Sequence, residues 1–238
     1  MKRILLLNAC LFGILLRATA QQEGDIYFEP AVGFDTRWIV NQDIYGNAEM
    51  DYVTSYGMFY GFHGSFFLKQ DFGLNAGIGF RKMGQKYDGM QQGAFARRNV
   101  TLNYIQVPVM AMFALSGHDY PTWFSIGPQF CVLANATQYF HREDGGTPLT
   151  RPDYLPEGEI NVTKWYKPFD IMIAMEFNRV MALRKLPKLS LNYVLETGYG
   201  VFDINRKEYQ IPNIHGVYKG SHNMYLGFRF GVMYNAIR

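Results

Sequence analysis

The C-terminal segment, residues 223–236, alternates between two kinds of side chain with a period of two. One alternate set is apolar, and it consists of Met224, Leu226, Phe228, Phe230, Val232, Tyr234 and Ala236. The other set is mostly small or polar, and it consists of Asn223, Tyr225, Gly227, Arg229, Gly231, Met233 and Asn235. Successive residues of a β-strand point to opposite faces, whereas an amphipathic helix needs apolar residues three and four positions apart. The segment is therefore predicted to be a strand with one apolar face.

Further segments with the same alternation cover most of the chain. They are residues 26–40, 55–69, 72–81, 103–115, 124–134, 169–178 and 189–201. Each is long enough to cross a bilayer as a tilted strand, which takes about 9–11 residues. The sequence therefore predicts an all-β fold made of long amphipathic strands.

The composition of the two faces indicates which one meets lipid. In a soluble barrel or sandwich the apolar face points inward, and in a membrane barrel it points outward. The polar faces here hold many Gly, Asn, Gln and Ser residues but few Lys or Glu, which is unusual for strands that face water. The apolar faces end in Trp and Tyr, whose amphipathic rings suit the headgroup region. These features favour a transmembrane, antiparallel, up-and-down β-barrel of eight strands, within a range of eight to ten.

The N-terminal residues have the features of a secretory signal. Lys2 and Arg3 are followed by a mostly apolar run over residues 4–16, and Ala18-Thr19-Ala20 has the small-x-small form of a cleavage site. We therefore predict a signal peptide at residues 1–20 and an outer-membrane barrel domain at residues 21–238. Only Cys131 then remains of the two cysteines, which excludes an intrachain disulfide. The net charge of +3 is small and its charges are scattered, so nothing indicates nucleic acid.

Short and long connections alternate between the predicted strands. The short ones are residues 69–71, 116–122 and 184–188, and the long ones are residues 41–53, 87–99, 141–163 and 205–221. Outer-membrane barrels have short periplasmic turns and longer external loops. The pattern therefore predicts an outer-membrane location with both termini in the periplasm.

Three prolines, Pro30, Pro108 and Pro128, lie inside predicted strands. Proline removes a hydrogen-bond donor from the ladder, and a closed barrel has no free edge where this loss is harmless. We therefore expect β-bulges or strand ends near all three.

The small or polar faces are predicted to line a narrow lumen that contains charges of both signs. These residues are Glu29, Asp35, Arg37, His63, Lys69, Arg81, Asp170, Glu176, Glu196 and Arg229. Opposite charges are expected to neutralise one another, because an eight-stranded barrel is just wide enough for side chains to fill it. The histidines have no metal-binding spacing, so we predict neither a metal site nor a cofactor.

Catalysis is an alternative because His63 and Ser65 lie two residues apart on the same predicted face. A hydrolase or acyltransferase also needs an orienting carboxylate and a recognisable nucleophile motif, and no nucleophile-elbow motif is present. We therefore predict that the protein is not an enzyme. Two alternative functions stay open at this point, a small channel or ligand carrier and a lipid-modifying barrel enzyme.

The fourth predicted strand contains Tyr104-Ile105-Gln106-Val107-Pro108. With the signal segment and the eight amphipathic strands, this motif resembles the PorT-like outer-membrane β-barrel family of Bacteroidota. The resemblance implies an outer-membrane location and no enzymatic activity, and some members of that family support protein secretion to the cell surface. It favours a scaffold, partner-binding element or secretion accessory. The expected partners are membrane lipids and lipopolysaccharide, the barrel-assembly machinery, and other envelope or secretion proteins.

The long connection at residues 141–163 is the predicted place for a partner contact. It is rich in proline and charge, and it exceeds the length of about 12–15 residues beyond which loops tend to be functional or disordered. Arg151 and Tyr154 are the predicted contact residues, because Arg and Tyr are enriched in binding hot spots. A tolerated surface insertion is the alternative.

The assignment of the two faces predicts unequal effects of neighbouring substitutions. Phe228→Arg should impair assembly, because a cation near the bilayer midplane costs about 2–4 kcal/mol in such barrels. Gly227→Ser, on the predicted lumen side, should be much milder. The comparison is made by the yield of folded barrel, and equal effects would mean that the faces are assigned wrongly.

Overall fold

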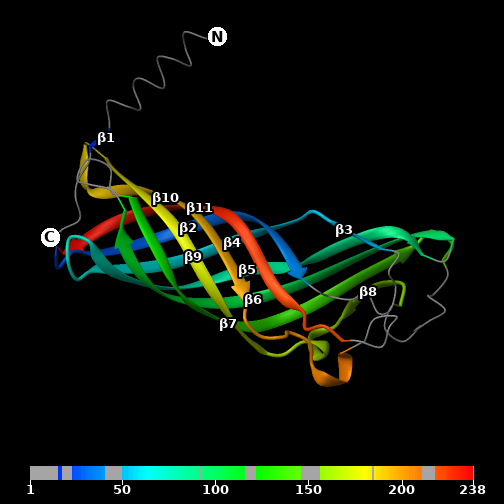
Figure 1. The fold of residues 1–238 in the computed structure, drawn as a ribbon. Coiled ribbons are helices and arrows are strands. Elements are labelled where there is room, and N and C mark those ends of the chain that lie inside the picture. The colour runs from blue at the N-terminus through cyan, green and yellow to red at the C-terminus, as the bar shows by residue number, and fades with distance from the viewer. Residues whose placement is uncertain are drawn as a thin grey trace, which may run out of the picture.

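A computed structural model describes residues 16–17, 23–40, 50–91, 93–115, 122–145, 156–183, 185–210 and 218–237. Eight long strands form a closed ring in these ranges. They are β2 (Ile26–Val40), β4 (Ser55–Phe67), β5 (Phe72–Gln91), β6 (Ala94–Ala114), β7 (Thr122–Arg142), β9 (Phe169–Leu183), β10 (Leu186–Gly200) and β11 (His222–Ile237). Every neighbouring pair is antiparallel, and the pairings of β7 with β9 and of β11 with β2 close the ring (Figure 1). The predicted all-β, up-and-down barrel is confirmed.

The strands turn their apolar face outward and their polar face inward. On β11, Phe228 is 58% exposed, whereas the next residue, Arg229, is 1% exposed. The same alternation runs along β2, where Phe34 is exposed and Asp35 is buried. This is the reverse of a soluble barrel, and it is the arrangement that a lipid environment favours. Within the described ranges, no helix is long and apolar enough to span a membrane.

Three strands extend well beyond the segments predicted for them. Residues 87–99 were predicted to be a loop, but β5 continues to Gln91 and β6 begins at Ala94, so that prediction is wrong. The short strands β3 (Asp51–Val53) and β8 (Gly158–Asn161) pair with β5 and β7. We call β3, β8 and residues 82–91, 94–103 and 135–142 the projecting sheet. It lies at the end of the barrel opposite the short strand β1 (Leu16–Arg17), which pairs with β9 (Figure 1).

The interior is layered along the barrel axis. One apolar cluster lies at the end where β2 begins, and it consists of Tyr27, Phe67, Met112, Trp123, Val180 and Met233. A larger apolar cluster lies at the other end and includes Ile39, Met83 and Tyr225. Along β2 the buried residues between Tyr27 and Ile39 include Glu29, Asp35 and Arg37. A charged layer is therefore enclosed by apolar side chains at both ends.

The prolines do not produce the bulges expected near them. The β2–β11 register is the same on both sides of Pro30, and the β5–β6 and β6–β7 registers are the same on both sides of Pro108. Pro128 pairs with Ile173 within a continuous run. The register shifts lie elsewhere, and one of them inserts Ala134 into β7 opposite the step from Asn103 to Tyr104. The inward set of β7 changes there, because Leu133 and Ala136 are both buried.

Glycines on the inner face make room for the charged side chains. A Cβ added to Gly227 would lie 2.5 Å from the Cβ of Asp35, and one added to Gly231 would lie 2.0 Å from Glu29 Oε1. Gly57 faces Asp35 from the other side, where an added Cβ would lie 2.5 Å from its Oδ1. The expectation that Gly227→Ser is mild is therefore wrong, because the lumen has no space for the added atoms. Its comparison with Phe228→Arg consequently does not test the assignment of the faces, which the exposure of Phe228 and the burial of Arg229 establish.

Substitution of the glycine beside Asp35 should impair folding. Gly227→Ala is expected to lower the yield of heat-modifiable folded barrel, since its Cβ would also lie 2.6 Å from the backbone oxygen of Phe34. Gly64→Ala is the matched control, because its added Cβ would meet its nearest atom at 3.9 Å. Equal yields for the two variants on unheated gels would contradict this account of the lumen.

Candidate functional site

Arg229 on β11 joins carboxylates from three other strands across the lumen. Its Nη1 lies 3.2 Å from Glu29 Oε1 on β2, and its Nη2 lies 2.8 Å from Glu176 Oε2 on β9. Its Nε lies 3.4 Å from Glu196 Oε2 on β10. All four side chains are buried. Glu176 and Glu196 are directly opposite in register, where like charges destabilise a sheet, so the contacts of Arg229 with both offset that repulsion.

Arg81 on β5 makes a second set of contacts that shares one of these carboxylates. Its Nη1 lies 2.9 Å from Asp35 Oδ2, and its Nη2 donates a hydrogen bond to Glu196. Its Nε–H donates to Gln106 Oε1 at 3.0 Å. The guanidinium lies between two aromatic rings, with its Cζ 3.8 Å from the Tyr225 centroid and 4.7 Å from the Phe59 centroid. Cation–π contacts of this kind are strongest where water is excluded.

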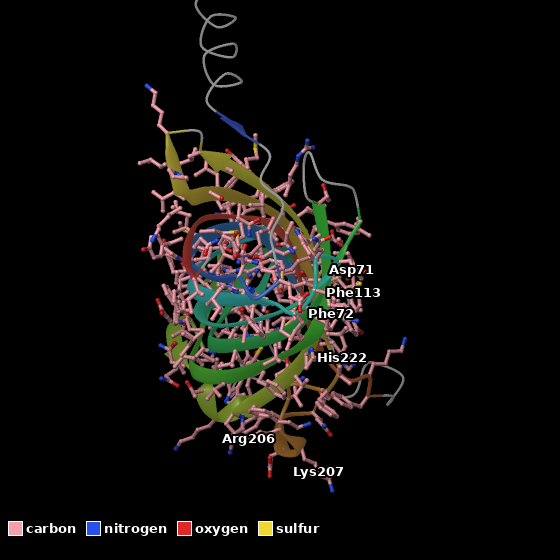
Figure 2. The ribbon with its side chains drawn as sticks, turned by 90° about the vertical axis from the view of Figure 1, so that its left-hand side faces the viewer. Asp71, Phe72, Phe113, Arg206, Lys207 and His222 are labelled. Atoms are coloured by element: carbon pink, nitrogen blue, oxygen red, sulfur yellow. The ribbon has the colours of Figure 1, made fainter. Side chains whose placement is uncertain are left out.

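The two arginines and their carboxylates form one network, because Glu196 contacts both. We call Glu29, Asp35, Arg81, Glu176, Glu196 and Arg229 the ion-pair layer. A buried ion pair contributes stability only when its partners are all present and well placed, and removing one partner leaves an uncompensated charge. Asn192 adds a hydrogen bond to Glu29 Oε2 at 2.9 Å. Seen along the barrel, side chains fill the ring of strands (Figure 2). The chemistry of the layer is charge neutralisation across the lumen.

Three other predicted lumen residues, Arg37, His63 and Asp170, form hydrogen bonds with residues outside the ion-pair layer. Arg37 donates from Nε to Ser55 Oγ at 3.0 Å, and Asp170 Oδ2 accepts from Asn223 Nδ2 at 3.0 Å. Both are buried, as is His63. Lys69 was predicted to face the lumen, and this is wrong, because β4 ends at Phe67 and Lys69 is exposed in the following turn. The predicted contact residues Arg151 and Tyr154 lie outside the described residues.

The pair that suggested catalysis is bridged by an amide. Asn75 Nδ2 donates to Ser65 Oγ at 2.8 Å, and Asn75 Oδ1 lies 3.2 Å from His63 Nδ1. All three side chains are buried. A nucleophile requires a base within hydrogen-bond reach and a group that orients that base, whereas the hydrogen bonds here join His63 and Ser65 each to Asn75. The arrangement is that of a hydrogen-bonded packing element.

Several residues that contact the ion-pair layer are not among the predicted site residues. Gln106 supports Arg81, Asn192 supports Glu29, and Tyr225 stacks on Arg81 and donates from its hydroxyl to Gln129 at 3.1 Å. The alternation placed these residues on the inner face, but only charged residues were selected there. In Tyr104-Ile105-Gln106-Val107-Pro108, the inward residues are the tyrosine, the glutamine and the proline, and the two aliphatic residues face outward.

Comparison with known proteins identifies a family for this chain and several distantly similar structures. A family model described as outer membrane protein beta-barrel domain matches residues 19–207. Solved structures that resemble this one include OprG from Pseudomonas aeruginosa, with 10% identity, a TM-score of 0.42, and coverage of 91% of this chain and 99% of OprG. Neisserial surface protein A has 10% identity and a TM-score of 0.42, over 88% of this chain and 99% of that one. Ail of Yersinia pestis has 7% identity and a TM-score of 0.36, over 90% and 100%. No curated protein matches the sequence.

Removal of the central arginine should destabilise the barrel. Arg229→Met is expected to cost about 3–5 kcal/mol, because it leaves the Glu29 and Glu176 carboxylates buried without their cation. Adding Glu176→Gln should restore part of this loss, since it removes one of the uncompensated charges. Arg97→Met, at an exposed position, is the control. The measurement is the denaturant midpoint in detergent, and an unchanged midpoint for Arg229→Met would contradict the role of the layer.

Proposed function

We infer the function from the family of the chain. The chain belongs to the outer membrane protein beta-barrel domain family. The protein is thus an integral β-barrel of the outer membrane. We propose that it is non-catalytic, that its barrel is a rigid scaffold, and that the projecting sheet binds a partner at the cell surface. One observation carries this proposal: the β-sheet wall continues past the apolar outward belt, above a lumen filled by ion pairs.

The orientation is part of the proposal. Ile26 and Ile237 are paired at one end of the barrel, and the turn at residues 68–71 connects strands at that same end. The longer connections, between β7 and β9 and between β10 and β11, join strands at the other end. Short periplasmic turns and longer external loops are typical of such barrels. This distribution supports periplasmic termini and a projecting sheet on the outside of the cell.

The projecting sheet has the properties of a preorganised binding surface. Its inward side is packed, since Tyr87, Val100 and Phe140 are buried in the larger apolar cluster. Its outward side exposes Tyr139, which is 42% exposed, and Tyr52 is 52% exposed where its ring packs against that of Tyr87. A rigid surface loses little conformational entropy on binding, and tyrosines provide large contact areas. These features support a protein partner that docks on the sheet.

A small channel is the weaker alternative. Ions would have to pass both apolar clusters and the ion-pair layer, in which Arg81, Glu196 and Arg229 are each at most 3% exposed. Displacing these side chains would uncover buried charges without partners, which is costly. The filled lumen therefore favours a scaffold over a channel.

A role as an accessory of protein secretion is the narrower form of the proposal. Its support is the resemblance to PorT-like barrels at Tyr104-Ile105-Gln106-Val107-Pro108, whose inward residues contact the ion-pair layer through Gln106. The predicted signal peptide belongs to the same proposal, as does a partner contact at Arg151 and Tyr154. All of these are compatible with a barrel delivered to the outer membrane.

Photo-crosslinking in intact cells tests the binding role. A crosslinking amino acid in place of Tyr139 or Arg97, both outward on the projecting sheet, should capture a discrete protein partner. The same amino acid in place of Val107, on the lipid-facing belt of β6, is the control and should capture lipid only. Purified protein should show no steady conductance in planar bilayers. Steady ion conductance, or identical crosslinks at all three positions, would contradict the proposal.

A further inference from the structure

A group of basic residues lies just beyond the outer ends of β9 and β10. The 3₁₀ turn η2 (Thr163–Trp165) precedes β9, and the 3₁₀ turn η3 (Lys207–Tyr209) follows β10. Lys164, Arg206 and Lys207 are exposed on these turns. We call these three residues the cationic rim. Beside them, the rings of Trp165 and Tyr209 stack with centroids 5.6 Å apart and an interplanar angle of 20°.

Backbone contacts hold the two turns together as one rigid unit. Tyr166 and Asn205 form a β-bridge, and Arg206 N–H donates to Trp165 O at 2.9 Å. The Arg206 Nε–H also donates to Tyr166 O at 3.0 Å. The Tyr166 and Ile204 side chains are buried in the larger apolar cluster, which anchors the unit to the barrel. The cations are therefore displayed from a fixed frame.

Asp203 stabilises the segment around η3 through hydrogen bonds. Its carboxylate accepts hydrogen bonds from the backbone N–H groups of Asn205 and Ser221 and from the Tyr218 hydroxyl. Burial raises the pKa of Tyr218 to about 12, so the hydroxyl remains protonated and able to donate at neutral pH. Because Asp203 is saturated by these donors, its charge is directed into the protein and away from the cationic rim.

Positive charge is concentrated on this side of the barrel. Residues 163–168, 203–210 and 218–222 contain five Lys or Arg side chains and two acidic ones, a net of three positive charges. The projecting sheet with its connecting residues, 51–53, 82–91, 94–103, 135–145 and 156–161, contains five basic and six acidic side chains. Among the described residues of the outer end, the imbalance therefore belongs to the η2–η3 unit and is not shared by the projecting sheet.

The cationic rim lies directly above lipid-facing apolar surface. Phe169, at the start of β9, is 48% exposed, and Val201 and Phe202, just after β10, are 46% and 53% exposed. In the view along the barrel, Arg206 and Lys207 lie outside the ring of strands rather than over the lumen (Figure 2). These apolar side chains are at the depth of the acyl chains. The cations next to them are therefore at the depth of the headgroup phosphates.

We propose that the cationic rim binds the phosphorylated sugar headgroup of an outer-leaflet glycolipid. Lys164, Arg206 and Lys207 supply the charge, since Lys and Arg both recognise phosphate and Arg does so through two parallel hydrogen bonds. The stacked Trp165 and Tyr209 rings supply an apolar face for the sugar. The inference rests on the outer-membrane location and on the proposed orientation, which places the cationic rim at the outer leaflet, and it goes beyond the proposed partner binding by the projecting sheet.

Native mass spectrometry of the folded, full-length mature barrel in detergent tests the site. The probes are lipid A with two phosphates, the same lipid A dephosphorylated, and inorganic phosphate as a competitor. The test variant is Lys164→Gln, Arg206→Gln and Lys207→Gln. The matched control is Lys82→Gln, Lys86→Gln and Arg97→Gln, which removes three exposed cations from the projecting sheet.

Phosphorylated lipid A should bind the wild type and the control equally. Binding to the test variant should weaken roughly a hundredfold, about fivefold for each cation removed from an anionic surface. The dephosphorylated lipid should bind the wild type as weakly, and this comparison holds even if the test variant folds poorly. Equal binding of both lipids, or an equal loss in the control variant, would overturn the proposal. Displacement by inorganic phosphate at the concentration of the lipid would instead assign a site for free anions. None of these outcomes alters the crosslinking test of the projecting sheet.

Discussion

The buried contact of Arg229 with Glu29, Glu176 and Glu196 is the interaction on which the rest of the barrel depends. A ring of eight strands fixes the width of its interior, so whatever points inward has to fill the space and satisfy its own charges. Arg229 contacts carboxylates on β2, β9 and β10, and Glu196 connects this group to Arg81 on β5. Strands that are not neighbours in the ring are thereby held at a fixed separation, and the closed ladder is reinforced from within.

This internal reinforcement explains how the wall can continue beyond the lipid belt. A β-sheet that leaves the bilayer loses the lipid that covers its apolar face, and an unsupported extension of two strands is only marginally stable. Here the larger apolar cluster extends upward from the charged layer and packs against the inner side of β5, β6 and β7. The η2 and η3 turns are anchored to the same cluster through Tyr166 and Ile204. Scaffold and outer surface are therefore parts of one continuous core.

Most of the ring could be predicted from the sequence, because the period of two gives a strong signal wherever one face meets lipid. The signal ends where the outward face becomes polar, and on β5 this happens between Phe80 and Lys82 although the strand continues. The sequence therefore predicts a loop at residues 87–99, where β5 and β6 in fact continue. Lys69 was misplaced for the opposite reason, since the alternation was extended past the end of β4 at Phe67. The alternation predicts which charged residues lie on the inner face, but it does not predict which of them form ion pairs with one another. Arg229 and Glu29 are separated by 200 residues, and only the closed topology brings them together.

The glycines of the inner face have a consequence for how such a barrel can evolve. The volume of each cross-section is fixed, so the space left by Gly57, Gly227 and Gly231 is the space that Asp35 and Glu29 occupy. A larger residue at one of these positions requires a smaller one opposite, and the inner face therefore changes in matched sets. Lipid adapts to any apolar shape, so outward residues such as Phe228 can change one at a time. A single closed sheet therefore predicts slow sequence change on its inner face and faster sequence change on its outer face.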